Sequence, residues 1–247
     1  MDNYIDKVLH SESLDPYYNL AYEDFLLRNP ENFSKKILFI WQSRPSIVLG
    51  RFQNPWLEID LKLAQRDNVL ICRRQSGGGT VYHDEGNLNF CFIGKTSKEE
   101  NFSWFIAQMK SLGVDIDVNE RNDLIFKNKK ISGSAFKNTK DNSFHHFTFL
   151  VQSNLDKLTQ YLHHDQINIT SKSVKSIRSK VVNLNVLSVA ELKAHFASSE
   201  QLKDNITLSS YEKFKSKKWI FGETPKYTFK SSDGIVKQVA KGKSPFE

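Results

Sequence analysis

The segment from Val69 to Ile93, VLICRRQSGGGTVYHDEGNLNFCFI, constrains the fold more than any other part of the chain. It predicts an apolar strand, a loop of small residues, a short second strand, a polar turn and a third apolar strand. The loop continues into Thr80-Val81-Tyr82, a β-rich tripeptide, so it joins a strand to a strand. A nucleotide bound here would therefore lie across a sheet face, without help from a helix N-terminus.

The loop has the composition of an anion-binding site. Gly77, Gly78 and Gly79 have no side chains, so a ligand can approach the backbone closely and meet its N–H groups. Arg73 and Arg74 precede them at the mouth of the loop, and a guanidinium matches a phosphate or carboxylate bidentately. A small anionic ligand across the loop is one interpretation, and a glycine turn beside two solvated arginines is the other. The loop matches neither GxxxxGK[ST] nor GxGxxG followed by a helix.

Length and composition are those of a globular protein. The 247 residues correspond to one large domain or one and a half, and 18 Phe and 8 Tyr indicate that aromatic side chains supply much of the burial. No apolar run approaches a membrane span, and MDNYIDKVLH lacks the features of a secretion signal or transit peptide. Cys72 and Cys91 form neither a disulfide framework nor a metal-binding spacing. We therefore expect a cytoplasmic protein with reduced thiols.

The net charge of +7 suits two kinds of partner. Clustered lysines and arginines neutralise the phosphates of a nucleic acid. An excess of positive charge serves equally well to attract an acidic protein and speed its encounter. Charge alone does not decide between them.

The other patterns predict helices and strands around the central segment. Asp15-Pro16 is a typical helix start, and an aromatic stripe from Phe102 to Leu112, capped by Gly113, predicts a second amphipathic helix. Ser188 with Glu191 is a capping box that opens another helix. We also expect strands at Ile37–Trp41 and Ser46–Gly50, a helix at Leu57–Arg66, and two strands around Ser-Asp-Gly in the C-terminal KYTFKSSDGIVKQVAK.

A second informative stretch, RNDLIFKNKKISGSAFK, begins at Arg121. Leu124–Phe126 and Lys130–Phe136, separated by Lys-Asn-Lys, predict a β-hairpin. Within the second strand, alternation would send Lys130, Ser132, Ser134 and Phe136 to one face. The two serines are small, so a ligand could lie along the strand with Lys130 at one end.

Several polar residues near this hairpin allow more than one interpretation. Lys127 and Lys129 suit a hairpin tip in water, whereas Lys130 suits it less well because the small residues after it pack poorly unless something fills the space. Asn122-Asp123 suits a strand-entry turn and a metal–phosphate contact equally. His145-His146 and His163-His164 suit structural roles, because strand neighbours point to opposite faces and cannot share a metal. The basic segment KSVKSIRSK is either solvated or a loop that contacts phosphate or a partner.

Taken together, these motifs resemble the lipoate–protein ligase family of the biotin/lipoate ligase superfamily. The resemblance extends from about Ser11 to Phe221. The matching segments, in the family's order, are DPYYNLAYEDFLL, VLGRFQNPW, RRQSGGGTVYHDEGNLNF, RNDLIFKNKKISGSAFK, FHHFTFL and SIRSKVVNL. The resemblance implies an α/β (α+β) catalytic domain at residues 1–223, with mixed β-sheets flanked by helices, related to class II aminoacyl-tRNA synthetases and biotinyl-protein ligases. Residues 224–247 would be a short hairpin and tail, which we interpret as a remnant of an accessory domain.

The resemblance also implies a two-step reaction. The lipoate carboxylate attacks the α-phosphate of ATP, with Mg²⁺, and gives lipoyl-AMP and pyrophosphate. A specific lysine of an acceptor then attacks the mixed anhydride and releases AMP. The implied acceptors are the acidic lipoyl domains of 2-oxoacid dehydrogenase E2 subunits and the glycine cleavage H protein. We expect a monomer without a tightly bound cofactor, a nucleic-acid partner or membrane association.

Site residues follow by carry-over of the motifs. Lys130 matches the lysine that contacts both lipoate and the adenylate, which makes it the catalytic candidate. Asn122 and Asp123 match residues near the phosphate and magnesium. The ATP-binding candidates are Arg74, Gly79, Thr80, Val81, Tyr82 and Lys130. The candidates for binding lipoate and lipoyl-AMP are Arg74, Ser76, Gly77, Gly78, Lys130, Ser132 and Lys137. An apolar slot for the lipoyl tail is also implied, but the sequence does not identify its walls.

The chain departs from the family pattern at Gln75, Glu85 and Phe147. Many bacterial ligases continue into a C-terminal domain linked to adenylation, so a separate accessory subunit or a lipoyltransferase that uses preformed lipoyl-AMP is the main alternative. A cysteine-dependent acyltransferase is disfavoured because Cys72 and Cys91 match no nucleophile position, and a biotin ligase because its arginine–glycine loop differs. A basic nucleic-acid-binding module is the distant alternative. The chain lacks the aromatic–basic strand motifs that such modules carry.

Overall fold

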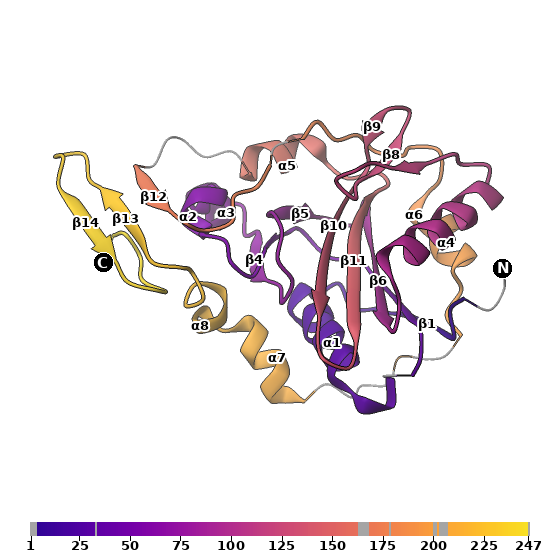
Figure 1. The fold of residues 1–247 in the computed structure, drawn as a ribbon. Coiled ribbons are helices and arrows are strands. Elements are labelled where there is room, and N and C mark those ends of the chain that lie inside the picture. Colours follow the sequence, from indigo (N-terminus) through magenta and orange to yellow (C-terminus); the bar gives the residue numbers. More distant parts are fainter. Residues whose placement is uncertain are drawn as a thin grey trace.

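The computed structural model describes residues 4–32, 34–162, 168–177, 179–199, 202 and 207–246. Its centre is a mixed five-stranded sheet in the order β1-β2-β6-β11-β10, shown in Figure 1. The strands are β1 (Lys7–His10), β2 (Ile37–Trp41), β6 (Asn87–Gly94), β11 (Ser143–Leu150) and β10 (Ser132–Asn138). β1 and β2 are parallel, and all other neighbours are antiparallel. Every residue of β6 is buried, because helices cover both faces of the sheet.

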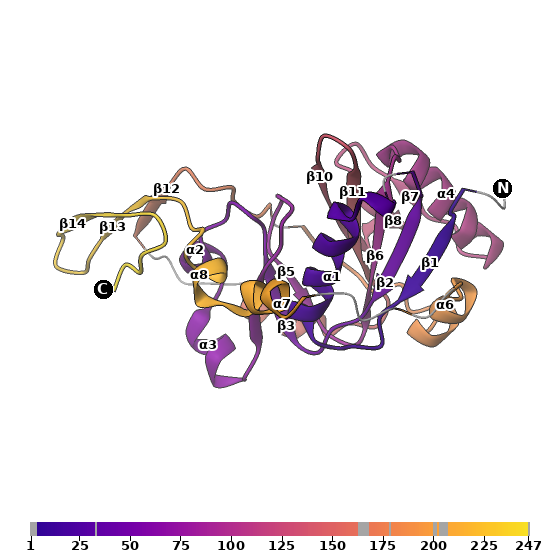
Figure 2. The same cartoon turned by 90° about the horizontal axis from the view of Figure 1, so that it is seen from below.

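Strand alternation divides the central sheet between two apolar cores. Ile37, Phe39 and Trp41 of β2 pack with α1 (Pro16–Arg28), whereas Leu38 and Ile40 pack with α4 (Lys98–Ser111) on the opposite face. Figure 2 shows the two helices on opposite sides of the sheet. The α4 side is an aromatic cluster built from Phe90, Phe102, Phe105, Phe147, Phe149 and Phe196.

The helix boundaries confirm the capping signals in the sequence. Asp15 accepts a hydrogen bond from the Tyr17 N–H at the start of α1, as predicted, and the helix ends at Arg28. Ser97 and Glu100 form a capping box that starts α4, and Gly113 follows its end with φ of +74°. Ser188 and Glu191 form the predicted capping box of α6 (Val189–His195). The predicted helix at Leu57–Arg66 is wrong in detail.

That region forms two short helices, α2 (Pro55–Glu58) and α3 (Leu61–Arg66). Ile59 between them is extended and buried, and the N–H of Asp60 donates to the Tyr161 carbonyl of α5 (Leu155–Tyr161). The Asp60 carboxylate then caps α3 by accepting from the Leu63 N–H. Tertiary contacts at Ile59 and Asp60 therefore interrupt a helix that periodicity predicted as continuous.

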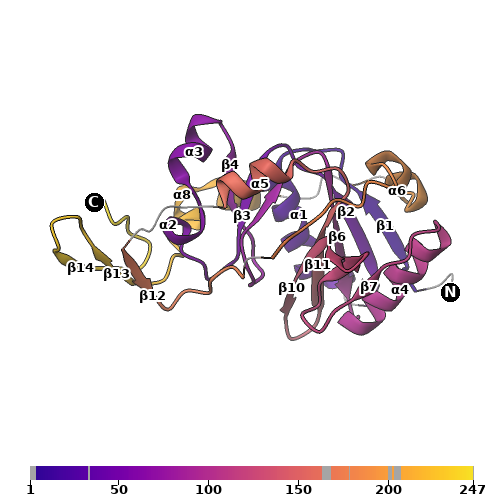
Figure 3. The same ribbon diagram turned by 90° about the horizontal axis from the view of Figure 1, so that it is seen from above.

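A three-stranded sheet in the order β4-β3-β5 holds the glycine loop. β3 (Ser46–Leu49) lies between β4 (Leu70–Arg73), which is parallel to it, and β5 (Val81–His83), which is antiparallel. The loop therefore passes from β4 to β5 across the end of β3, which confirms the predicted strand–loop–strand arrangement. Figure 3 shows this sheet beside the central one, with α5 above it.

The second hairpin region forms the sheet β7-β8-β9, from β7 (Asp117–Val118), β8 (Leu124–Phe126) and β9 (Lys129–Lys130). The predicted single strand Lys130–Phe136 is wrong, because Ile131 separates β9 from β10. Ile131 is fully buried, and its N–H donates to the Leu124 carbonyl. Strand alternation therefore does not carry over from Lys130 into β10.

The C-terminal part extends away from the central sheet, as Figure 1 shows. α7 (Leu208–Lys215) and α8 (Lys217–Ile220) lead to a small sheet in the order β12-β13-β14. Its strands are β12 (Ile169–Ser171), β13 (Tyr227–Lys230) and β14 (Val236–Val239), so the predicted strands around Ser-Asp-Gly are confirmed. A short 3-10 helix, η1 (Pro30–Asn32), completes the described elements. No helix among the described residues is both long and apolar enough to cross a membrane.

Candidate active site

Two adjoining cavities lie between the β4-β3-β5 sheet and strands β10 and β11. The first has a volume of about 430 Å³ and the second about 360 Å³. Their shared lining comes from the glycine loop, the hairpin, the central sheet and a covering segment, through Thr80, Val81, Lys130, Gly133, Thr148 and Lys175–Ile177. The two motifs singled out in the sequence therefore meet at one place.

Arg74 holds the glycine loop in its curled form. Its Nη2 donates to the carbonyls of Gly77 (2.5 Å) and Gly79 (2.7 Å), and its Nε donates to Ser76 Oγ (3.0 Å). Gly78 between these carbonyls has φ of +84°, where L side chains are strained. Arg74 is 5% exposed and lines the second cavity, so its positive charge lies close to that space.

The predicted position of Arg73 at the mouth of the loop is wrong, because its side chain is fully buried. Its guanidinium donates to the carbonyls of Gly50, Gln53 and Ile220 at 2.7–3.0 Å, and also to the Thr224 hydroxyl. Burial lowers the pKa of Arg73 to about 10, so it stays charged at neutral pH. Arg73 therefore joins the 50–53 loop to the end of α8, while its chain neighbour serves the glycine loop.

The segment before Arg178 covers the glycine loop. Ser176 Oγ accepts from the Thr80 N–H (2.8 Å) and the Gln53 amide (3.0 Å), and the Ser176 N–H donates to the Glu58 carboxylate. A side chain on Gly79 would come within 3.1–3.4 Å of Ser176, so glycine permits this close approach. The part of the basic segment that ends at Ile177 therefore covers the two cavities. Arg178 lies outside the described residues.

Lys130 and Asp123 form an ion pair at the junction of the cavities. Lys130 Nζ lies 2.8 Å from Asp123 Oδ1, and both side chains are largely buried. Asn122 has φ of +60°, and the Asn119 amide oxygen accepts from the Asp123 N–H, so residues 119–123 form a strand-entry turn. The turn places the Asp123 carboxylate in the second cavity and leaves Asn122 outside the lining of both.

Near Lys130, the second cavity offers one carboxylate, that of Asp123, to a cation. Among the described residues no group of three His, Cys, Asp or Glu could hold a metal ion. Asp123 is a carboxylate that faces the second cavity. Mg²⁺ in nucleotide sites is commonly bound through one or two carboxylates, phosphate oxygens and water, so a single carboxylate suffices for such a role.

The inner end of the second cavity is apolar and aromatic, and the sequence did not identify its walls. They come from α1, β2, β3, β5 and β11 as Leu20, Trp41, Val48, Val81, His83 and Phe147. His83 stacks edge-on against Trp41, and neither of its ring nitrogens has a partner among the described residues. Burial lowers the pKa of His83 to about 3, so the imidazole is neutral.

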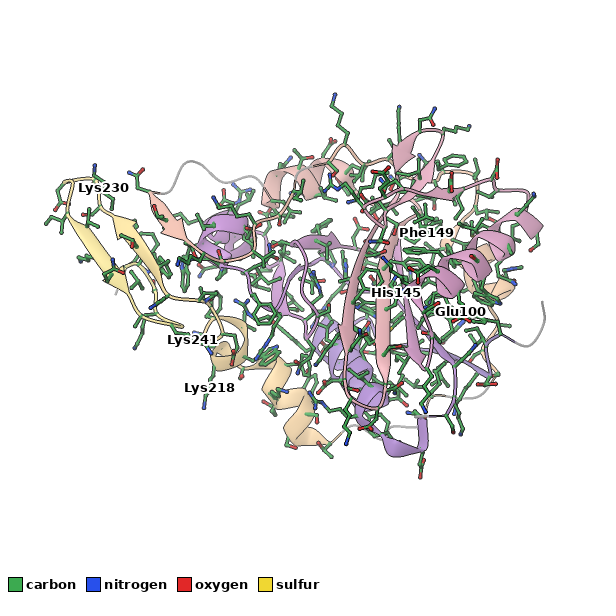
Figure 4. All side chains as sticks on the ribbon, viewed as in Figure 1. Glu100, His145, Phe149, Lys218, Lys230 and Lys241 are labelled. Carbon is green, nitrogen blue, oxygen red and sulfur yellow. The ribbon has the colours of Figure 1, made fainter. Side chains whose placement is uncertain are left out.

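A buried polar chain connects α1 to the glycine loop. Trp41 Nε1 donates to Glu23 Oε1 (2.9 Å), which lies 3.2 Å from His146 Nδ1, and His146 Nε2 lies 2.8 Å from Ser76 Oγ. His145 points to the opposite face of β11, toward Phe102 and Phe136, as alternation predicted (Figure 4). His163 and His164 lie outside the described residues.

The predicted ligand-binding residues fall into four groups. Thr80, Val81 and Lys130 line both cavities. Tyr82 and Ser132 line the first, and Arg74, Gly78, Gly79 and Asp123 line the second. Ser76, Gly77, Asn122 and Lys137 line neither of them. Lys137 Nζ instead donates to Gln75 Oε1 (3.2 Å), one of the positions that depart from the family pattern.

The face predicted for β10 needs correction. Ser132, Ser134 and Phe136 pair across the sheet with Phe149, Phe147 and His145, which are on the aromatic side of β11. Gly133 and Ala135 share the opposite face with Thr148 and His146, and all four line the second cavity. Ser132 lines the first cavity and Ser134 the second, but their side chains are on the opposite face of β10. They do not share a face with Lys130 because Ile131 interrupts the strand between Lys130 and Ser132.

Comparison with known proteins shows which family the chain belongs to. A family model described as the lipoyl protein ligase A/B catalytic domain matches residues 15–201. The chain belongs to this family. A curated relative, the lipoate-protein ligase A of Psychrobacter cryohalolentis, is 44% identical over 181 residues, covering 72% of this chain and 53% of the relative. The chain therefore spans about half the length of that relative.

Solved structures agree with this membership. LipL1 of P. falciparum, solved in complex with lipoate, superposes with a TM-score of 0.78 at 28% identity, covering 93% of this chain and 82% of LipL1. A lipoate-protein ligase A solved with bound ATP superposes with a TM-score of 0.73 at 21% identity, covering 87% of this chain and 98% of that protein. The predicted α/β architecture with mixed sheets flanked by helices is confirmed.

Proposed function

We propose that this chain is the catalytic domain of a lipoate–protein ligase, which converts lipoate and ATP to lipoyl-AMP and transfers the lipoyl group to a lysine of an acceptor lipoyl domain. The observation that carries the proposal is that two cavities, one ending in apolar walls, meet beside Lys130, which is held there by its ion pair with Asp123. The names of the relatives support it, since one was solved with lipoate and another with ATP.

In this proposal the second cavity receives the acyl chain. Its inner end, with Leu20, Trp41 and Val48, suits an apolar tail, while Arg74 and Lys130 suit the carboxylate. The first cavity receives the nucleotide, where Tyr82 and several leucines offer apolar surface to a base and Ser176 offers a hydroxyl. Because Lys130 lines both, the carboxylate and the α-phosphate would meet beside its ammonium.

The two chemical steps then need little from the protein beyond position and charge. A carboxylate oxygen bonds to the α-phosphorus while the bond to pyrophosphate breaks, and pyrophosphate leaves with the electron pair. The acceptor amine next bonds to the acyl carbon, AMP leaves with the electron pair of the acyl–oxygen bond, and the amine releases a proton to solvent.

Lys130 would stabilise the charge that develops on the carbonyl and phosphate oxygens, and Asp123 fixes its position. Magnesium, when bound with ATP, would neutralise phosphate charge, and Asp123 would supply a carboxylate ligand to it. We further propose a cytoplasmic monomer whose acceptors are the acidic lipoyl domains of 2-oxoacid dehydrogenase E2 subunits and the glycine cleavage H protein.

A lipoyltransferase that uses preformed lipoyl-AMP, or a ligase that needs an accessory subunit, is the second candidate. The contacts that grip an activated acyl-nucleotide would be the same in both candidates.

One experiment separates the candidates. The purified protein is incubated with an apo lipoyl domain, once with lipoate and MgATP and once with synthetic lipoyl-AMP, and the mass of the acceptor is measured. A lipoyl mass increase in both reactions identifies a complete ligase, and an increase with lipoyl-AMP alone identifies a transferase. An acceptor left unmodified in both reactions would contradict the proposal.

A further inference from the structure

The positive charge of the chain is concentrated at its C-terminal end. Residues 207–246 contain nine lysines and three acidic residues, whereas the whole chain has a net charge of +7. All nine lysines are exposed, from Lys213 on α7 to Lys243 after β14. Figure 4 shows Lys218, Lys230 and Lys241 at the end of the molecule opposite α4. Most of the charge excess therefore belongs to residues 207–246, which form α7, α8 and the C-terminal hairpin β13-β14.

Exposed apolar side chains gather at the mouth of the cavities and on the same C-terminal part. Phe52 (56% exposed), Val174 (43%) and Ile177 (68%) form an apolar rim at the mouth, where the Val174 N–H donates to the Phe52 carbonyl. Val174 and Ile177 also line the second cavity. Of the eight large apolar residues that are exposed in the described part of the chain, six lie in this rim or at Ile235, Val236 and Phe246.

A short series of contacts joins the rim to the lysine-rich end. Arg51, next to Phe52, lies 3.1 Å from the Glu223 carboxylate and stacks on Trp219 of α8. Lys241 lies 3.1 Å from the same carboxylate. β12, which pairs with β13, leads along the chain directly into the segment that carries Val174. The rim is therefore connected to the β12-β13-β14 sheet both through Arg51 and Glu223 and through the chain that follows β12.

Lysines on edge strands also discourage unwanted strand pairing, which gives a simpler reason for Lys237 on the edge strand β14. That reason does not extend to the lysines of α7 and α8 or to the apolar rim. A surface that combines exposed apolar groups at its centre with like charges at its margin has the composition of a protein-binding site.

We infer that this surface docks the acceptor, an acidic folded domain, with the apolar rim around the modified lysine and the C-terminal lysines against its acidic face. The inference rests on the proposed function, because only an acceptor needs to bring an amine to the mouth of the cavities. The opposite charges would speed encounter, and the rim would hold the acceptor once it has arrived.

The test compares two double variants that change the net charge equally. Lys230→Glu with Lys237→Glu reverses charge on the C-terminal sheet, and Lys95→Glu with Lys110→Glu reverses charge at exposed positions on or beside α4. Direct binding of an acidic apo lipoyl domain is measured by calorimetry at low and high salt. We expect the first pair to weaken binding about tenfold at low salt and to reduce the salt dependence, and the second pair to stay within about twofold of wild type.

A third variant, Phe52→Ala, tests the rim. It should weaken acceptor binding at both salt concentrations and leave lipoate-dependent pyrophosphate release unchanged, because Phe52 lines neither cavity. Pyrophosphate release without acceptor reports the proposed function by itself, so its failure is distinguishable from a failure of docking. Equal affinities for wild type and the Lys230–Lys237 variant would overturn the docking inference.

Two further arms exclude other occupants. A duplex oligonucleotide that binds more tightly than the acidic domain, through the same lysines, would also overturn the inference. So would concentration-dependent self-association in sedimentation that the Phe52→Ala variant abolishes.

Discussion

The glycine loop and the β8-β9 hairpin face each other across the two cavities, but different interactions hold them in place. Arg74 fixes the glycine loop and Arg73 fixes the neighbouring 50–53 loop, both through buried hydrogen bonds to main-chain carbonyls. Lys130 projects from a two-residue strand and is held by one ion pair with Asp123. The arginine contacts are part of the folded core, whereas Lys130 depends on a single ion pair near the surface of the cavities. Removing an arginine should therefore lower stability, and removing Lys130 should lower the reaction rate.

The largest effect is expected from Arg73→Met. Removing the guanidinium leaves several buried carbonyls without a donor, so the free energy of unfolding should fall by about 3–5 kcal/mol. Urea denaturation followed by far-UV circular dichroism measures it, with Arg66→Met as the exposed control, whose midpoint should not move. If Arg73→Met were as stable as wild type, the proposed contrast between the structural arginines and Lys130 would be contradicted.

Lys130→Ala should act on the chemistry instead. We expect a loss of about 10²–10³-fold in the lipoylation rate, as for removal of one group that stabilises developing charge, with little change in the urea midpoint. Lys129→Ala is the matched control, because Lys129 is the exposed neighbour on the same short strand and lines neither cavity. A slow enzyme with an equally low midpoint would show that Lys130 also belongs to the fold.

A third prediction concerns the pH dependence of stability and two buried histidines, His83 on β5 and His145 on β11. Burial lowers the pKa of His83 and of His145 to about 3, against 6.5 in an exposed histidine. As pH falls from about 6.5 towards 3, the unfolded chain binds protons that the folded chain does not, so stability decreases. The loss should be on the order of 2 kcal/mol per histidine at pH 5.

Urea midpoints at pH 7.5 and pH 5 measure this loss, and His145→Gln should reduce the difference by removing one of the two groups. Equal midpoints of the wild-type protein at the two pH values would contradict it.

The smallest effect is expected from the double variant Cys72→Ala, Cys91→Ala. Both thiols are fully buried, and burial raises their pKa well above the ordinary value, so neither is a ready nucleophile. The rate of acyl transfer from lipoyl-AMP should stay within about twofold of wild type, measured on protein confirmed as folded. A loss of transfer with the fold intact would favour a thioester mechanism.

The sequence predicted the parts of the molecule where local signals and tertiary structure agree. The caps at Asp15 and Ser188, the aromatic stripe of α4 and the strand–loop–strand around Gly78 all appear as expected. Each of these depends on neighbours within a few residues, such as a side chain that caps a nearby N–H.

The errors arise where a distant residue decides the outcome. Arg73 and Arg74 are identical in type, and only the packing of α8 against the 50–53 loop buries the first as a structural residue. Ile131 breaks a strand because a long-range core needs its side chain. The apolar end of the second cavity is assembled from five elements, so no single segment of sequence carries a signal for it.

The contact between Gly50 and the glycine loop limits how this site can be re-engineered. A β-carbon at position 50 would lie 2.1 Å from the Gly78 carbonyl oxygen, a main-chain atom that cannot rotate away. Libraries designed to accept new acyl chains can therefore target Leu20 and Val48, which line the second cavity, but any member that carries even alanine at residue 50 would displace the whole turn. Substitutions at the apolar end of the second cavity can therefore be combined only with an unchanged Gly50–Gly78 contact.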